Sequence, residues 1–577
     1  MSEKELRLFG KSDKPDHESA WKLYDRALEF NQRIQLEDTV KANENFYIGK
    51  QWEGIEANGQ PTIQLNFLKR VVGFTVSTVT TDNINVNASA LAASENTDEM
   101  IEPVRIVNEE FVALTERNRI PAMLRVFTRD AAVDGDGCTY TYWDAEATNK
   151  GGRKGEIRTE IIDNTRVFFG NPNDRRVQTQ PYIQIATREI TRRVKLRAKQ
   201  NGMRDWERIQ PDSEAEGATD TVKAADDKTT VLRTFWRDEE SGEIWCFEST
   251  KDSGVREPWN LNIKLYPITW LNWDYVKDCY HGQAMITGLI PNQISVNQLY
   301  SMTVIHGKRA AFPKVVYNKT LVSKWDNRVG SAIGIAGGDI NNVAKIVEGA
   351  PLNPQISNLI TQLVKETEES MGATSTAMGE GRADNTSAII ALQRAAATPT
   401  ELTKQNLYES VEDLYRIYLE FMANYYGKRM VDMEPPEEMM QQAAALGVQL
   451  PEKMAMEFDF SILKDHPMTI KLDVGASSYY SEIASIQTLD NLLRDGHINV
   501  IQYLERIPDG YIPARRALIQ EIKGQQAAQM AAQQQMQPEM TGGSPMAGIG
   551  TPDINGGSGY GSLQRQINAT GDTKGLV

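Results

Sequence analysis

The chain has 577 residues, of which 40% are hydrophobic and 24% charged, and its formal net charge is −15. This length allows about three or four domains of about 150 residues each, and the composition is that of an ordinary globular protein. The acidic balance disfavours a protein that grips DNA tightly, because such proteins are usually basic, but it allows a surface along which nucleic acid slides.

The cysteines and the apolar content exclude further classes of protein. The three cysteines, Cys138, Cys246 and Cys279, form no Cys-x-x-Cys pair, so neither a disulfide framework nor a zinc site is expected. Residues 1–19 are charged and contain no apolar run, and therefore no signal peptide is expected. No stretch approaches the roughly 18 uninterrupted apolar residues of a membrane helix. These features predict a soluble intracellular protein.

The first half of the chain changes from helical to extended patterns. Residues 17–50 carry apolar residues at helical spacing, and residues 98–132 are also predicted to be helical. Between them, in QLNFLKRVVGFTVSTVTTDNINVNASA, the first half predicts a helix and the second half an extended segment. Residues 133–275 alternate β-branched or aromatic residues with polar ones, which predicts an antiparallel meander. A helical insert, ITRRVKLRAKQNG, interrupts this meander, and a loop is expected near 210–228.

A helical hairpin is predicted next. Residues 281–311 have a helical pattern whose apolar stripe includes Leu289, Ile294 and Ile305, and Pro291 favours a boundary or kink near its position. Residues 312–352 are Gly-punctuated and β-like, and a second helix is predicted over Asn353–Met371. A small β module is therefore expected at the tip of a pair of helices.

The last third begins with a glycine-bearing loop from Gly372 to Thr386. A helix over Glu401–Tyr426 is then predicted, because apolar residues recur at steps of three and four, and Pro399 should kink or break it near its beginning. The stretch MTIKLDVGASS predicts a strand, and a helical pair is expected over 480–505. Past Gly524 the composition is dominated by Gln, Met, Gly, Ser and Pro, which predicts a short helix and then a flexible tail.

Nucleotide-binding motifs are missing from the sequence. The Gly-Lys-Ser at 10–12 lacks the upstream glycine of a phosphate loop, since Glu5 stands there, and no predicted strand precedes it. In GEGRAD, at 379–384, Asp384 occupies the position of the third glycine of a dinucleotide fingerprint. The loop before the long helix is therefore not expected to bind a nucleotide.

Metal and catalytic motifs are also missing. The five histidines include no pair at i, i+4. Asp134-Gly-Asp136-Gly resembles the start of a calcium loop, but Glu146 falls one residue too late to be the ligand at loop position 12, so a tight β-turn is expected there. No Gly-x-Ser-x-Gly elbow is present. A carboxylate dyad stays open because acidic residues are abundant. No catalytic residue, cofactor site or metal site is predicted, and the chain is not expected to be an enzyme.

The order of these elements resembles the portal proteins of tailed bacteriophages, which form a dodecameric ring at one capsid vertex. The resemblance covers roughly residues 20–520, and the shared order of the segments carries it. The matching segments are ENFYIGKQW, QLNFLKRVV, TDNINVNA, HGQAMITGLIPNQISVNQLYS, MGATSTAMGEGRADNTSAIIALQ and TIKLDVGASSYYSEIASIQTLDNLLRDGHI.

The resemblance implies an α+β subunit. Its parts would be an α/β wing (1–280), a first stem helix (281–311), a small β-rich clip (312–352), a second stem helix (353–372), a tunnel loop (373–386), the kinked tunnel helix with the rest of the wing (387–510), and a short crown helix with a disordered tail (511–577).

The resemblance also implies a function. The ring would be a channel for packaging and ejecting double-stranded viral DNA and a docking site for the terminase large subunit and then a head-tail adaptor. Other implied partners are the major capsid and scaffold proteins, with no cofactor and no membrane. The protein would be made in the host bacterial cytoplasm and reside in the virion. Two alternatives are a nucleic-acid-processing or packaging enzyme, which the missing phosphate loop opposes, and a capsid or tail protein that does not contact DNA.

Two sets of residues follow as candidate sites. Twelve copies at −15 each would carry a charge of about −180, so the lumen of the ring could be acidic. An acidic lumen would repel phosphate and let DNA slide. The glycines of the tunnel loop would give flexibility, its hydroxyls weak hydrogen bonds, and Arg382 a phosphate contact; the alternative for Arg382 is an intersubunit salt bridge. The DNA-facing set is Gly372, Thr374, Ser375, Thr376, Gly379, Gly381 and Arg382. A basic collar at the clip and stem would comprise Lys308, Arg309, Lys314, Lys319, Lys324 and Arg328, with a solvated basic surface and intersubunit pairs as the alternative.

Overall fold

The structure is a computed structural model, and it describes residues 15–54, 56, 61–82, 84–90, 98–148, 154–212, 227–311, 314–326, 333–337, 339, 343–347, 351, 353–373, 400–433, 454–474, 479–507, 518–519 and 522. It divides into two compact units, Met1–Glu482 and Ile483–Val577. Within the described residues, no helix combines the length and the apolar character needed to cross a membrane.

The helices of the first 134 residues begin and end where local chemistry requires. The helical stretch predicted over 17–50 forms two helices, α1 (His17–Arg33) and α2 (Leu36–Ile48). Asp16 caps α1, since its carboxylate accepts from the Ser19 backbone N–H at 2.7 Å. The break between α1 and α2 falls at Gln35, whose φ is +53°. Helix α3 (Phe67–Val79) is followed by strand β1 (Ile84–Ala90), which confirms the predicted change from helix to extended segment.

Residues 98–132 are helical as predicted, but in two pieces. Helix α4 (Asp98–Arg117) is followed by α5 (Ile120–Asp134). The chain turns at Arg119, where φ is +51°, and Pro121 stands in the first turn of α5, where its missing N–H costs no hydrogen bond.

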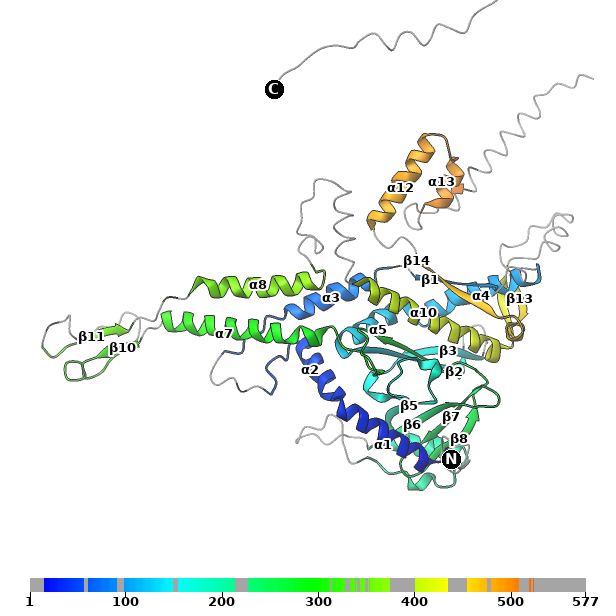
Figure 1. Cartoon of the computed structure of the whole chain (residues 1–577), viewed down its shortest axis with the longest axis horizontal. Coiled ribbons are helices and arrows are strands. Elements are labelled where there is room, and N and C mark those ends of the chain that lie inside the picture. The colour runs from blue at the N-terminus through cyan, green and yellow to red at the C-terminus, as the bar shows by residue number, and fades with distance from the viewer. Residues whose placement is uncertain are drawn as a thin grey trace, which may run out of the picture. The chain divides into compact units, whose positions relative to one another are not determined.

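The predicted meander is confirmed, although it forms two antiparallel sheets. One has the order β3-β2-β9 and the other the order β4-β5-β6-β7-β8. Helix α6 (Thr191–Gln200), the predicted insert, lies between β5 and β6 in the chain, and α1 lies beside the five-stranded sheet (Figure 1). The strands are β2 (Asp136–Thr148), β3 (Lys154–Ile161), β4 (Val167–Phe169), β5 (Tyr182–Ile190), β6 (Lys228–Arg237), β7 (Ile244–Ser249), β8 (Gly254–Asn260) and β9 (Ile268–Asn272).

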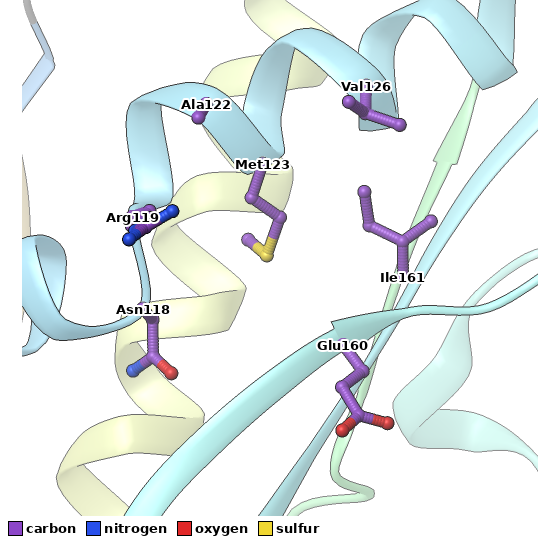
Figure 2. Close-up of a pocket in the computed structure, with 7 residues that line it drawn as sticks. All are labelled: Asn118, Arg119, Ala122, Met123, Val126, Glu160 and Ile161. Atoms are coloured by element: carbon purple, nitrogen blue, oxygen red, sulfur yellow. The ribbon is translucent and has the colours of Figure 1, made fainter.

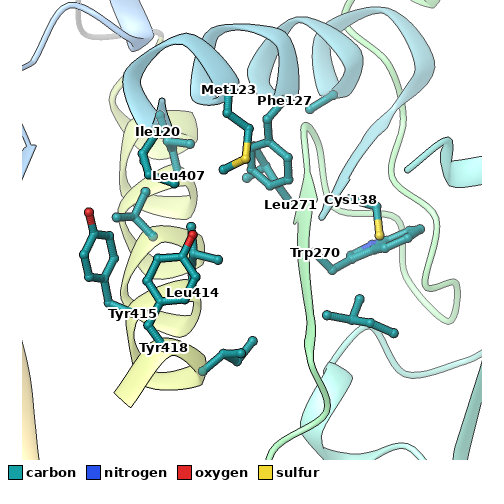
Figure 3. Packing of buried hydrophobic residues seen from close by; sticks show 14 of the residues in the cluster. Ile120, Met123, Phe127, Cys138, Trp270, Leu271, Leu407, Leu414, Tyr415 and Tyr418 are labelled. Carbon is teal, nitrogen blue, oxygen red and sulfur yellow. The ribbon is translucent and has the colours of Figure 1, made fainter. Parts of the chain in front are cut away.

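Helix α10 (Glu401–Phe421) supplies the centre of the main core. It continues through a π-helical turn over Met422–Tyr426, and its predicted apolar face is buried. Figure 3 shows Leu407 and Leu414 of this face opposite Met123 of α5 and Leu271 of β9. Because burying each such side chain contributes about 1.5–3 kcal/mol, this helix holds α5 and the three-stranded sheet together. Pro399, the predicted kink residue, lies outside the described residues.

Distant parts of the chain meet in the remaining strands. Strand β14 (Met468–Val474), predicted from its sequence, pairs antiparallel with β1 from Ile84↔Val474 to Ala90↔Met468. The hairpin of β12 (Lys428–Met433) and β13 (Met454–Asp459) was not predicted. The predicted helical pair is confirmed as α12 (Tyr479–Arg494) and α13 (Val500–Arg506). Short 3-10 helices cover Asn164–Arg166, Val177–Thr179, Trp206–Arg208, Ile286–Gly288 and Phe460–Lys464.

The predicted pair of helices with a β module between them is observed. Helices α7 (Ile290–Ala311) and α8 (Pro354–Ser370) lie side by side, and the antiparallel pair of β10 (Lys314–Tyr317) and β11 (Ala344–Val347) lies beyond their far end (Figure 1). The helix expected from His281 begins instead at Ile290, so that prediction was wrong by nine residues at its start. Pro291 stands in the first turn, where a residue without an N–H is tolerated.

The buried face of α7 also differs from the predicted apolar stripe. The buried residues are Gln293, Val296, Asn297 and Ser301, whereas Ile294 and Ile305 are half-buried. The reason is that α7 packs against the backbone of residues 61–65, whose carbonyl groups need hydrogen-bond donors.

Candidate functional site

The far end of the α7–α8 pair carries a concentration of basic side chains. Lys308 and Arg309 lie in the last turn of α7, and Lys314, Lys319 and Lys324 follow on β10 and the turn after it. All five are exposed, and none forms an ion pair within the described part of the chain. Arg328 lies outside the described residues.

One basic residue of this end was missed by the sequence analysis. Lys345 on β11 pairs with Val316 of β10 across the two strands, and both side chains are exposed. Residues 308–352 contain seven basic and three acidic residues, a formal charge of +4 against −15 for the whole chain. Only the pairing of β10 with β11 brings Lys345 beside the predicted cluster, which is why periodicity did not indicate it.

Gly372 marks the opposite end of α8. Its φ is +72°, and its N–H donates to the Glu369 carbonyl at 3.1 Å, while the N–H of Ala373 donates to the Glu368 carbonyl at 2.9 Å. A left-handed residue that closes these bonds ends a helix and is usually glycine. Gly372 therefore terminates α8. The other predicted members of the loop, Thr374, Ser375, Thr376, Gly379, Gly381 and Arg382, lie outside the described residues.

Buried amides fix α7 to the rest of the first unit. The Gln293 amide donates to the Leu65 carbonyl at 2.6 Å and to the Asn297 side-chain oxygen at 2.9 Å. The Asn297 amide in turn donates to the side-chain oxygen of Gln51 at 2.6 Å. Each satisfied hydrogen bond contributes about 1 kcal/mol, and an unsatisfied buried partner costs more. This series of hydrogen bonds therefore fixes the position of α7.

Contacts between the helices add to this attachment. The Asn292 amide donates to the Thr367 hydroxyl across the two helices at 2.9 Å. Arg70 of α3 forms an ion pair with Glu368 in the last turns of α8. The Leu68 N–H of α3 also donates to the side-chain oxygen of Gln293 at 3.4 Å, so the base of the helix pair is tied to α3 from both helices.

A buried carboxylate organises the segment that leads into α7. The side chain of Asp136 is fully buried. One of its oxygens accepts from the Asn272 amide and from the Gly282 N–H, both at 2.7 Å. The other lies 2.6 Å from His281 Nδ1 and accepts from the Asn164 amide at 3.3 Å. Asp136 therefore joins the three-stranded sheet and the 3-10 helix at Asn164–Arg166 to the residues that precede α7.

The tight β-turn predicted at Asp134-Gly-Asp136-Gly was wrong. Asp134 is the last residue of α5, Gly135 caps the helix with φ of +102°, and Asp136 begins β2. A Cβ at position 135 would lie 2.6 Å from the Gly282 carbonyl oxygen. Glycine is required there by both the backbone conformation and the close approach of Gly282, and neither constraint is visible without the tertiary structure.

An open pocket of about 540 Å³ lies between the beginning of α5 and strand β3 (Figure 2). Its polar residues serve the local fold. The Asn118 side chain hydrogen-bonds to the backbone of β3 at Ile157 and Thr159, and the Glu160 carboxylate accepts from the Tyr142 hydroxyl at 2.6 Å. Among the described residues, no group of three or more His, Cys, Asp or Glu side chains could hold a metal ion.

The comparison with known families decides the identity. Residues 181–455 match the model of a family described as Phage P22-like portal protein. The chain is a phage portal protein. The match runs from β5 through α6, the α7–α8 pair with its β hairpin, and α10 to the start of β13. No curated protein matches the chain.

This identity confirms the expected function, and the mixture of helices and strands in the structure confirms the α+β fold class. The portal protein belongs to a structural family, forms a homo-oligomeric ring and associates with the capsid and with DNA. It is part of the virion, at the capsid vertex through which viral DNA is packaged and ejected.

Proposed function

We propose that the α7–α8 pair is the stem of the portal and that residues 312–352 are its clip. The observation that carries this proposal is the antiparallel β10–β11 pair at the far end of two adjacent helices that are fixed at their base by buried amides. The wing would then comprise 1–280 and most of 387–510, with the tunnel loop at 373–386 and a short crown with a tail at 511–577. A ring of twelve copies is the proposed assembly.

The proposed DNA path follows from the charge of the chain. An acidic lumen would repel phosphate, so that duplex DNA slides rather than being held by counterion release. The tunnel loop would contact the DNA through Arg382, with the hydroxyls of Thr374, Ser375 and Thr376 beside it. The loop would act mechanically, and ATP hydrolysis would belong to a terminase motor. The portal itself would need no cofactor and catalyse no reaction.

The basic far end of the α7–α8 pair is the proposed docking site for the terminase motor. Its exposed Lys314, Lys319 and Lys324 have no ion pairs among the described residues, so an acidic partner would meet charges that are not already neutralised. The terminase large subunit would dock here during packaging, and a head-tail adaptor afterwards. Assembly would take place in the host bacterial cytoplasm with the major capsid and scaffold proteins.

The experiment that tests the architecture is cryo-electron microscopy of the purified protein, with a mass determination on the same sample. We expect a closed ring of about twelve copies, with α7, α8 and the β10–β11 pair forming one narrow end around an open axial channel. A compact closed dimer without a channel would overturn the proposal, as would a ring in which the β10–β11 pair lies at the outer rim instead of at one end of the channel.

Docking is tested by replacing Lys314, Lys319 and Lys324 with Gln and measuring binding of the terminase large subunit to the ring. A matched control replaces three other exposed and unpaired lysines, Lys41, Lys464 and Lys471. We expect weaker terminase binding in the first variant alone, with both rings intact. Equal binding by the two variants would contradict a docking role for the basic end.

A further inference from the structure

A second basic surface lies on α6 and the turn that follows it. Residues 191–210 contain seven basic and two acidic residues, a formal charge of +5. We call this the α6 surface and define it by its exposed or half-exposed basic side chains that have no ion pair among the described residues. These are Arg192, Arg193, Lys195, Lys199 and Arg204.

The remaining basic residues of this region do have partners. Arg197 forms ion pairs with Glu189 at 2.8 Å and with Glu248 at 3.5 Å, and its role is to tie α6 to the sheet. Arg208 pairs with Asp205 at 3.5 Å. Among the described residues, the five basic side chains of the α6 surface therefore differ from Arg197 and Arg208 in having no acidic partner.

Apart from Lys199, whose ammonium lies 5.2 Å from the centre of the Trp206 ring, the fold of this region does not depend on these charges. Val194 and Ala198 point inward and form a small buried cluster with Ile209, Val231 and Val255. The charged side chains stand on the other side of the helix. The α6 surface can therefore be altered without removing buried contacts.

Two of the basic residues lie where their charge lowers the stability of the helix. Arg192 and Arg193 lie in the first turn of α6, which contains no acidic residue. The N-terminus of a helix carries partial positive charge, so cations there are unfavourable. Where a sequence breaks a local rule without a compensating contact in the fold, a functional cause is expected.

The spacing of the charges suits a polyanion. Arg192, Lys195 and Lys199 stand at i, i+3 and i+7, which places them on one face of the helix. At a rise of about 1.5 Å per residue, this face extends about 10 Å. Phosphates on one DNA strand are separated by about 3.4 Å along the helix axis. The face is therefore long enough to follow about three consecutive phosphates.

We propose that the α6 surface binds the phosphate backbone of duplex viral DNA outside the channel of the ring, a location that rests on the proposed assignment of residues 1–280 to the wing. Three of the five residues, Arg192, Arg193 and Arg204, are arginines, whose planar guanidinium forks match phosphate oxygens. DNA is the polyanion that the established function of this protein brings to it. The binding is independent of sequence, because backbone contacts carry no base information.

The test uses the assembled ring of the full chain and a covalently closed circle of duplex DNA, which cannot thread through the channel. The variant carries Arg192→Gln, Arg193→Gln, Lys195→Gln and Arg204→Gln. A charge-matched control carries Lys41→Gln, Arg125→Gln, Lys464→Gln and Lys471→Gln, which are also exposed and unpaired within the described residues. A second control, Leu196→Gln, alters the same surface without changing its charge. Binding is measured by electrophoretic mobility across a range of salt concentrations.

We expect both controls to bind the circle as the natural chain does, and the variant to bind it at least tenfold more weakly at 0.1 M salt. Each phosphate contact contributes about 0.9 to the slope of log affinity against log salt. Loss of four contacts should therefore reduce that slope by about 3.6 for each subunit that contacts the circle. Thermal unfolding of the variant should occur at no lower temperature than that of the natural chain, because replacing Arg192 and Arg193 removes an unfavourable interaction with the helix N-terminus.

Three outcomes would overturn the inference. The variant could bind the circle with unchanged affinity and salt slope. The charge-matched control could lose as much affinity as the variant, which would make the effect one of net charge. The variant could lose binding of a polyglutamate chain but not of the circle, which would assign the surface to an acidic protein. Ring assembly is checked first by electron microscopy, so that failure of the ring is distinguished from failure of the α6 surface.

Discussion

Replacement of Asp136 by Ala should be one of the most damaging single changes in the chain. The carboxylate is fully buried and holds four groups: the Asn272 amide, the Gly282 N–H, His281 Nδ1 and the Asn164 amide. Alanine leaves all four without this acceptor. An unsatisfied buried donor costs about 1–3 kcal/mol, and breaking a buried pair costs about 3–5 kcal/mol. Because the losses are not additive, we expect the free energy of unfolding to fall by about 3–5 kcal/mol.

Urea unfolding followed by tryptophan fluorescence is a suitable assay for this change. Trp270 donates to the Tyr280 carbonyl at 3.2 Å, next to His281, and so reports on this region. The control is Glu412→Ala, which removes an i, i+4 ion pair worth about 0.3–0.5 kcal/mol. Asp136→Asn keeps one acceptor oxygen, so its loss of unfolding free energy should lie between those of Asp136→Ala and Glu412→Ala. A loss below about 1 kcal/mol for Asp136→Ala would refute the view that this carboxylate organises the segment before α7.

Three further predictions concern neighbouring features and the proposed channel. Gly135→Ala should destabilise the chain by more than Gly242→Ala, because both residues have positive φ but a Cβ at 135 also meets the Gly282 carbonyl; equal melting temperatures would contradict this. Burial raises the pKa of Asp134 to about 8, so the folded state binds this proton more tightly than the unfolded chain, and stability should fall as pH rises from about 4 to about 8. Asp134→Asn should remove that fall, with Asp38→Asn on the exposed face of α2 as the control, and a pH–stability profile unchanged by Asp134→Asn would refute it. Arg382→Ala should leave the ring intact but alter DNA packaging or retention, whereas loss of the ring on electron micrographs would show that Arg382 is structural.

The helices and strands whose sequences show a short repeating pattern were predicted correctly. The face of α10 follows from apolar residues at steps of three and four, and these residues are buried. The strands of the meander follow from alternation, and the pair α7 and α8 from two helical patterns on either side of a glycine-punctuated segment. Such patterns are local, since they record which side of a helix or strand faces the core.

The candidate sites were predicted less completely. The collar lysines were identified because they lie close together in the chain, but Lys345 joins them only through the pairing of β10 with β11. The sequence predicted a helical insert at the α6 surface. Nothing in its pattern distinguished Arg197, which forms ion pairs, from Arg192, which forms none among the described residues. Ion pairing depends on which acidic residues the sheet brings nearby, and a sequence pattern does not contain that information.

The sequence by itself determined the order of helices and strands, the resemblance to a portal protein and the absence of a phosphate loop, because these depend on residue types at fixed local spacings. The tertiary structure alone decided that β1 pairs with β14, that the buried face of α7 is largely polar, and that Asp136 joins the three-stranded sheet to the residues before the helix pair. Each of these involves groups far apart in the chain. Their positions follow from the simultaneous packing of the whole core, and the hydrogen-bond needs of buried groups then select which distant residues meet.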